Sequence, residues 1–242
     1  MSLPKAFQGV FLIFSLLGAN AFAQIPTHVI FIGGGSASGK STVAVELKTA
    51  LEKKEKKVTY ITLDHYFDPL AQPKELYIDG TPNYDHPSAV RFNSFREDLN
   101  NLLAGKLTYA PKYDFTTLKV ADNKIPLRPA DFLIVDGIHA LSDESLSVMA
   151  SHPNIAASKV FIRCNTGVRN LRRAKRDLRE RSCSNDFARE YNRICFELTR
   201  IVNPMFDQFI APTQAKASLV VEGTHRIDDI VKTIIEHLHL PN

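Results

Sequence analysis

The chain has 242 residues, which is enough for one α/β domain with a sizeable core and not comfortably enough for two. Apolar residues make up 44% of it and charged residues 23%, and these globular values exclude disordered and fibrous architectures. The net charge of +4 is a mild excess that suits a protein binding anionic phosphates and gives no indication of a nucleic-acid partner.

The first 23 residues have the layout of a cleavable secretory signal. Lys5 provides a positive charge, residues 10–19 form a short apolar stretch, and the small residues Ala21 and Ala23 precede a predicted cut after Ala23. A membrane anchor needs about 20 apolar residues, so no stable membrane anchor is expected. Export is therefore predicted, with a cytoplasmic location as the alternative if the start or the signal is not used.

Residues 24–242 are predicted to form a single domain. Its three cysteines, Cys164, Cys183 and Cys195, have neither zinc-site spacing nor a CxxC motif. They are either three unpaired thiols or, in an exported protein, one thiol and a Cys183–Cys195 disulfide.

A phosphate-binding loop follows the first predicted strand. Residues 28–34, HVIFIGG, have the apolar, β-branched pattern of a buried parallel strand, and TVAVELKTALEKK after the loop has helical spacing. The segment between them fits G-x-x-x-x-G-K-[ST], in which backbone N–H groups and the positive end of a helix surround a phosphate. The predicted cofactor is ATP, or GTP, bound by Gly34, Gly35, Ser36, Ala37, Ser38, Gly39, Lys40, Ser41 and Thr42.

Two carboxylates stand at the ends of further predicted strands. Asp64 follows KVTYITL, where it can accept a hydroxyl proton near the γ-phosphate, and Tyr66 and Phe67 beside it can wall an apolar pocket. Asp136 follows the strand at residues 132–135 and is the candidate partner of Ser41 in a Mg²⁺ shell; the alternative is a helix N-cap.

The remaining chain alternates strands and helices. FNSFREDLNNLLAGK is predicted to be a helix ended by Gly105, SKVFIRC and ASLVVEG to be strands, and IDDIVKTIIEHLHL to be an amphipathic closing helix. We therefore expect a P-loop NTPase-type three-layer α/β sandwich with a mainly parallel central sheet. Residues 64–125, which are rich in aromatic and turn residues, are predicted to form an acceptor-binding insert.

An arginine-rich helix, NLRRAKRDLRERS, lies within the region 166–200. Arg169, Arg173 and Arg176 share one helical face, and Asp177 and Glu180 interrupt the positive charge. This composition is typical of a solvated, salt-bridged surface, and it also suits a lid that closes over a nucleotide and neutralises the moving phosphoryl group.

These features favour a small-molecule kinase. A GTPase would carry switch loops and an N-K-x-D motif, which the sequence lacks, and a motor ATPase would be longer. His139 is interpreted as a packing or capping residue. The sequence leaves a monomer and a homo-oligomer both open.

Seven segments in order, GGSASGKST, LDHYF, NYDHPSA, PKYDF, IVDGIHAL, RRAKRDLRER and NPMFDQFIAP, resemble the uridine–cytidine kinase family, within the wider group that includes phosphoribulokinase. The resemblance covers residues 28–240. It implies that Asp64 is the general base on a ribose 5′-hydroxyl, that Asp85 binds the ribose hydroxyls and that Tyr113 contacts the nucleoside. It also implies a lid of Arg173, Arg176 and Arg181. The expected catalytic residues are then Asp64, Lys40, Arg173 and Arg176, and the expected substrate-binding residues are Asp64, Phe67, Asp85, Tyr113 and Arg173.

Several positions depart from that family's pattern. Leu118 stands where a base-reading histidine is usual, Ser182 and Cys183 replace a glycine and an arginine, Glu222 replaces an arginine, and Asp136 replaces a glutamate. Mg-ATP-dependent phosphorylation of uridine or cytidine is the leading hypothesis. The alternatives are a related kinase acting on another ribose-containing or polyol acceptor, and a nucleotide-binding regulatory protein whose catalysis has decayed.

Overall fold

The computed structural model describes residues 26, 28–115, 117–180 and 186–239. The predicted signal segment, Arg181, Ser182 and Cys183 lie outside these residues, so the role of Arg181 and the Cys183–Cys195 disulfide stay predictions. No helix within the described ranges is long and apolar enough to cross a membrane.

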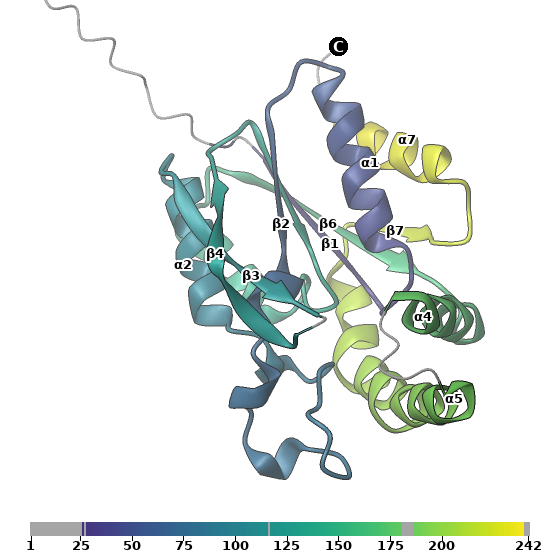
Figure 1. The fold of residues 1–242 in the computed structure, drawn as a ribbon. Helices are drawn as coiled ribbons and strands as arrows, with labels where there is room; N and C mark the ends of the chain where they lie inside the picture. The colour runs from purple at the N-terminus through teal and green to yellow at the C-terminus, as the bar shows by residue number, and fades with distance from the viewer. Residues whose placement is uncertain (1–25, 27, 116, 181–185, 240–242) are drawn as a thin grey trace, which may run out of the picture.

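Five parallel strands form the central sheet (Figure 1). Their spatial order is β2 (Val58–Thr62), β5 (Phe132–Asp136), β1 (His28–Gly34), β6 (Ala156–Arg163) and β7 (Leu219–Glu222). The central strands β1 and β5 are buried along nearly their whole length, as expected for strands covered on both faces. The prediction of a parallel sheet is confirmed, and all five sequence segments predicted to be its strands belong to it.

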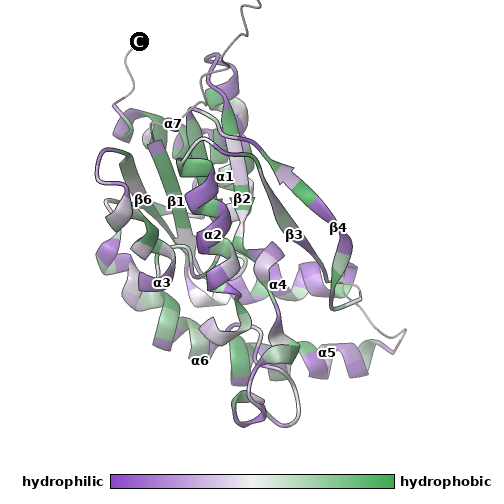
Figure 2. Ribbon diagram, turned by 90° about the vertical axis from the view of Figure 1, so that its left-hand side faces the viewer, coloured by the Kyte–Doolittle hydropathy of each residue, from purple (hydrophilic) through white to green (hydrophobic). Residues whose placement is uncertain are grey.

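Helices cover both faces of this sheet, which confirms the three-layer architecture. On one face, Ile30 and Ile32 of β1 pack among the apolar side chains of α1 (Lys40–Glu52) and α7 (Ile227–His237). On the other face, Val29 and Phe31 pack in a cluster with α2 (Phe92–Leu103), beside which lies α3 (Asp143–Leu146). The alternation of β1 side chains between the two faces therefore divides the core in two. Figure 2 shows the strands between these helices as predominantly hydrophobic.

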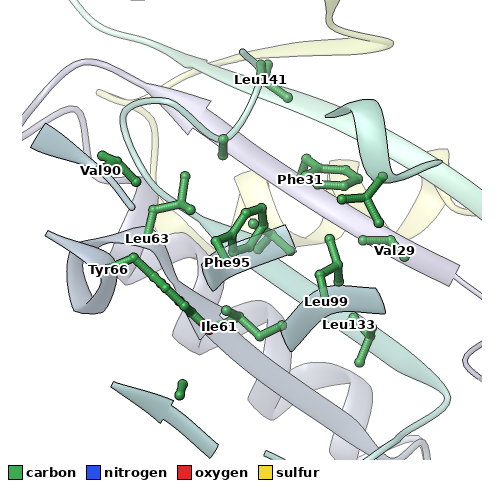
Figure 3. Close-up of a cluster of buried hydrophobic side chains, with 14 of the residues drawn as sticks. Val29, Phe31, Ile61, Leu63, Tyr66, Val90, Phe95, Leu99, Leu133 and Leu141 are labelled. Carbon is green, nitrogen blue, oxygen red and sulfur yellow. The ribbon is translucent and has the colours of Figure 1, made fainter. Parts of the chain in front are cut away.

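The second of these clusters anchors the part of the chain that carries Asp64 (Figure 3). Phe95 and Leu99, one helical turn apart on α2, are fully buried against the sheet, and α2 ends before Gly105, which has φ 73°. Leu63 and Tyr66, in the 3₁₀ turn Leu63–Tyr66 that follows β2, enter the same cluster. Since Asp64 lies between them, burial of its neighbours fixes the turn that presents it.

The insert contains a β-hairpin that the sequence did not predict. Strands β3 (Thr108–Asp114) and β4 (Lys119–Leu127) pair antiparallel and form a sheet of their own. Before the hairpin, the chain from residue 69 to residue 89 folds into three short 3₁₀ turns joined by loops. Figure 1 shows the insert beside the central sheet and extending past the carboxyl ends of its strands.

The predicted arginine-rich helix is α4 (Thr166–Glu180), which directly follows β6. It is succeeded by α5 (Phe187–Phe196), and then by two π-helical segments, Glu197–Val202 and Phe206–Ile210, on either side of α6 (Asn203–Met205). A 3₁₀ segment, Ala211–Lys216, leads into β7. Figure 1 shows α4 and α5 at the carboxyl end of β1, where the phosphate-binding loop begins.

Candidate active site

The strand register brings the two predicted carboxylates to the same edge of the sheet. Asp136, the last residue of β5, is in register with Ile32 of β1 on one side and Thr62 of β2 on the other. Two residues after Thr62 comes Asp64, whose backbone N–H donates to the Thr62 hydroxyl over 3.2 Å. The phosphate-binding loop starts two residues after Ile32. Adjacent strand ends thus place the loop, Asp136 and Asp64 together, as expected for ligand sites of parallel sheets.

The loop itself has the backbone shape that its glycines predict. Gly39, immediately before α1, has φ 104°, a conformation that favours glycine. A Cβ on Gly35 would lie 2.5 Å from Nη1 of Arg169, which is buried beneath the loop. The Arg169 guanidinium stacks 3.6 Å above the Phe206 ring and donates to the backbone oxygen of Cys164. The loop is therefore packed closely on α4 at Gly35.

A cavity of about 800 Å³ opens beside this loop and joins most of the predicted site residues. Its wall is formed by the phosphate-binding loop, the 3₁₀ turn after β2, the insert and α4. The predicted residues that line it are Ser36, Ala37, Gly39, Lys40, Ser41, Thr42, Asp64, Phe67, Asp85, Arg173 and Arg176. Segments that are far apart in the sequence, from residue 36 to residue 176, therefore share one chamber.

Asp136 is almost completely buried and is not part of the cavity lining. Its Oδ2 accepts a hydrogen bond of 2.9 Å from the Tyr60 hydroxyl. Burial raises the pKa of Asp136, while the Lys40 ammonium and the Ser41 hydroxyl oppose that shift and Asp64 adds to it. Burial and the neighbouring Asp136 charge likewise raise the pKa of Tyr60, which keeps its hydroxyl a donor.

The surroundings of Asp136 fit a magnesium ion. Its Oδ1 has no hydrogen-bond partner within the described chain, and the Ser41 hydroxyl lies next to the carboxyl group. Among the described residues, no three His, Cys, Asp or Glu side chains form a self-sufficient metal site. The Asp136 carboxyl and the Ser41 hydroxyl match the usual magnesium site of phosphoryl transfer, in which one or two protein oxygens are completed by phosphates and water.

Arg173 connects the phosphate-binding loop with the insert. Its Nη1 donates to the Ser36 hydroxyl over 2.9 Å and lies 3.6 Å from Oδ2 of Asp85. On the lid side, its Nε lies 3.3 Å from Asp177 and its Nη2 lies 3.7 Å from Glu197. Burial alone lowers the pKa of Arg173, but these three carboxylates outweigh burial and the net shift is upward. One buried cation thus joins the two halves of the cavity.

Two further arginines of α4 face the same region. Arg176 lines the cavity and pairs with Asp177 over 2.9 Å. Arg172, which was not among the predicted site residues, donates through Nη1 to the backbone oxygen of Gly223 over 2.9 Å and of Ser38 over 3.4 Å. It therefore ties α4 both to the phosphate-binding loop and to the turn after β7.

Some predicted residues are placed away from the cavity surface. Tyr113 is buried behind it, with its ring 6.0 Å from that of Phe67 and 5.0 Å from that of Phe115. Tyr66 was expected to wall an apolar pocket, and that expectation is wrong. Its ring lies in the core, and its hydroxyl donates to Asp98 over 2.8 Å. Gly34, Gly35 and Ser38 of the loop also lie outside the cavity lining.

Other cavity residues were missed by the sequence interpretation. On the insert side these are Thr81, Tyr84 and Phe115, and near the turn after β7 they are His225, Arg226 and Ile227. Leu118, which the sequence analysis had noted at the position of a usual histidine, also lines the cavity. From the lid side come Arg193 and Glu197, which pair with each other over 2.6 Å. The four-residue spacing of that pair is a usable signal, but it is equally common on solvated helix surfaces.

The model of the Phosphoribulokinase / Uridine kinase family matches residues 29–228. The chain belongs to this family. The match covers the phosphate-binding loop, the insert, α4 and β7, so every element that lines the cavity lies inside it, up to the start of α7.

Relatives agree with this assignment. The chain is 32% identical over 204 residues to a uridine kinase of Halobacterium salinarum, covering 84% of each chain. It is 34% identical over 217 residues to a uridine kinase of Staphylococcus aureus, covering 88% of this chain and 97% of that one. Among solved structures, a possible uridine kinase from Bacillus stearothermophilus superimposes with a TM-score of 0.52 at 16% identity, covering 83% of this chain and 91% of the other, and shows the shared fold.

Proposed function

We propose that this protein is an ATP-dependent nucleoside kinase that transfers the γ-phosphoryl group of ATP to the 5′-hydroxyl of uridine or cytidine. Membership of the family and the two uridine kinase relatives support the reaction. The observation that carries the proposal is the shared cavity. A phosphate-binding loop, a carboxylate at a neighbouring strand end and a buried carboxylate in the insert all line it.

In this proposal the loop holds the triphosphate tail. The Lys40 ammonium neutralises charge on the β- and γ-phosphates, and the backbone N–H groups at the start of α1 add the positive end of a helix. Arg173 and Arg176 face the cavity from α4 and neutralise charge on the phosphoryl group as it moves. Arg172 holds the loop and the turn after β7 to α4, which keeps the donors in place.

Asp64 is proposed to accept the proton of the attacking 5′-hydroxyl. It lies at the strand end beside the loop and lines the cavity, which is the position required of a general base in phosphoryl transfer. Ser41 and Asp136 would hold magnesium, which would supply positive charge to offset that of the phosphates.

Asp85 and its neighbours are proposed to hold the acceptor. A carboxylate can accept hydrogen bonds from two vicinal ribose hydroxyls, and the Arg173 guanidinium, 3.6 Å away, helps to orient Asp85. The rings of Phe67 and Phe115 and the side chains of Leu118 and Ile138 supply an apolar wall for a flat base. Leu118 offers no hydrogen bond to that base, so the proposed site relies on shape and on backbone or hydroxyl groups to choose between bases.

The experiment is a coupled assay of ADP release by purified protein with ATP, magnesium and a panel of nucleosides, sugars and polyols. We expect uridine or cytidine to be phosphorylated and Asp64→Asn to lower kcat about 10²- to 10⁴-fold, with ATP binding nearly unchanged. Asp79→Asn makes the same chemical change at an exposed insert position outside the cavity and should behave as wild type. ATP binding without release of ADP on any nucleoside would contradict the proposal, and full activity of Asp64→Asn would contradict the role of Asp64.

We also propose that the protein is exported after cleavage behind Ala23. The charge, apolar stretch and small residues of the first 23 positions support this. N-terminal sequencing of the protein isolated from its native cells should give Gln24 as the first residue, and an intact Met1 would contradict the proposal.

A further inference from the structure

His139 is a fully buried titratable residue that the phosphoryl-transfer chemistry does not use. It lies three residues after Asp136, in the loop between β5 and α3. Its Nε2 is 3.0 Å from the backbone oxygen of Asp85, which is 54 positions away in the insert. Its own backbone oxygen accepts from the Ser145 hydroxyl over 2.9 Å, so the loop that carries the ring is itself fixed to α3.

Asp85 has a role that depends on the position of its backbone. Its side chain is buried, faces the cavity and lies 3.6 Å from Arg173. The segment around it, residues 83–86, has no strand or helix ladder to hold it, because it runs between short 3₁₀ turns. The Gln72 side chain donates to the backbone oxygen of Asn83 over 2.8 Å and accepts from its backbone N–H over 3.1 Å. Both residues belong to the insert. From outside the insert, Asn83 Nδ2 donates to Sδ of Met205 over 3.3 Å, and Arg173 contacts the Asp85 side chain. The His139 ring contacts the backbone of Asp85 itself.

We propose that His139 is a positioning residue for the acceptor site: its Nε2–H donates to the Asp85 carbonyl and thereby holds the Asp85 carboxylate where the acceptor's hydroxyl pair binds. The same short loop carries Asp136 at one end and His139 at the other, and Ile138 between them lines the cavity. One short stretch of chain therefore connects the carboxylate beside the phosphate-binding loop with the contact to the Asp85 backbone. This inference rests on the proposed nucleoside kinase activity.

The chemistry of the ring agrees with a permanent donor. A carbonyl oxygen only accepts, so the ring must carry its proton on Nε2, and Nδ1 has no partner within the described residues. Burial lowers the pKa of His139 to about 4; the nearby Asp85 and Glu144 oppose the shift, and His86 adds to it. The ring of Phe92 packs edge-on against the His139 ring, with 6.4 Å between the ring centroids. Across the neutral pH range His139 is therefore an uncharged donor of fixed orientation.

The test compares His139→Gln with His139→Met. The two side chains have similar length and volume, but only glutamine has an N–H where histidine has Nε2–H. For each variant, kcat and the KM values for ATP, uridine and 2′-deoxyuridine are measured. We expect His139→Met to raise the KM for uridine about tenfold, with the KM for ATP within about twofold of wild type. The KM for 2′-deoxyuridine should rise less, because that acceptor offers Asp85 fewer hydroxyls, and His139→Gln should restore the wild-type pattern.

Equal behaviour of the glutamine and methionine variants, or a rise in the KM for ATP as large as that for uridine, would overturn the inference. A second measurement needs no substrate and no variant: ¹⁵N NMR of the wild-type ring between pH 5 and 8. A neutral ring protonated on Nε2 supports the inference, and a ring protonated on Nδ1 overturns it. If the wild type phosphorylates no nucleoside, the proposed function fails, and the NMR result still decides whether His139 can hold the Asp85 carbonyl.

Discussion

The close approach of Gly137 to Leu63 gives the sharpest test of how Asp64 is positioned. Gly137 follows Asp136 at the end of β5, and a Cβ placed on it would lie 2.7 Å from Cβ of Leu63. Ordinary contact begins at 3.4 Å, so the two backbones would have to separate by at least 0.7 Å. Leu63 is buried and adjacent to Asp64, which would move with it away from Asp136.

We expect Gly137→Ala to lower the free energy of unfolding by about 1–3 kcal/mol, the usual cost of overpacking a core. We expect kcat to fall about 10- to 100-fold, because displacement of a catalytic group by about 1 Å can cost 10²-fold. ATP affinity, measured by calorimetry, should change little, since Gly137 does not line the cavity. Gly167→Ala is the control, because the nearest atom to its Cβ would be a side-chain oxygen of Asn165 at 3.2 Å. A folded Gly137→Ala enzyme with wild-type kcat would refute the view that this contact positions Asp64.

Three further outcomes are expected. Tyr60→Phe removes the hydrogen bond that the Tyr60 hydroxyl donates to Asp136. It should lower the free energy of unfolding by about 1–2 kcal/mol and raise the magnesium concentration needed for half-maximal activity. If both values stay unchanged, Tyr60 does not support Asp136. Leu99→Ala should cost about 2–5 kcal/mol in urea unfolding, since Leu99 is fully buried between α2 and the sheet. His139 has a lower pKa when folded than when unfolded, so its neutral form favours folding above pH 6.5 and this stability is lost as the pH falls toward 4. Relative to His139→Gln, the wild type should lose about 2 kcal/mol between pH 7 and pH 5, and parallel profiles would contradict the assigned pKa.

The nucleotide half of the site was predictable because its determinants are local. The glycine spacing from Gly34 to Gly39 fixes the loop, and the apolar run before it can only be a buried strand of a covered sheet. Asp64 and Asp136 were predictable for a related reason. Parallel strands end at the same edge, so a carboxylate just after each of two strands must lie near the loop that follows a third.

The insert was less predictable because its hairpin carries little hydrophobic signal. In β4 only Leu127 is buried, and the other positions are exposed or partly exposed. Such a strand is held by its pairing with β3, which no local periodicity reveals. Leu118 shows why the hairpin matters for the site. The sequence analysis noted it by its place after PKYDF. Its position on the cavity wall depends on the connection between β3 and β4, where it has φ 56°.

Alternating charges on α4 and in the segment after it can form either a solvated surface or a buried ion cluster. How the helix packs decides which of the two forms. Arg173, Asp177 and Glu197 have the spacing and composition of a solvated, salt-bridged surface, yet Arg173 and Asp177 are buried and Glu197 is partly buried, because α4 packs on the phosphate-binding loop. Once water is excluded, each ion in such a cluster depends on its partners, and removing one leaves an uncompensated buried charge. Arg173 is therefore part of the domain's folded core and of its candidate site at once. A substitution such as Arg173→Ala should disturb stability, nucleotide binding and acceptor binding together, in contrast to the selective effects expected at Asp64 and His139.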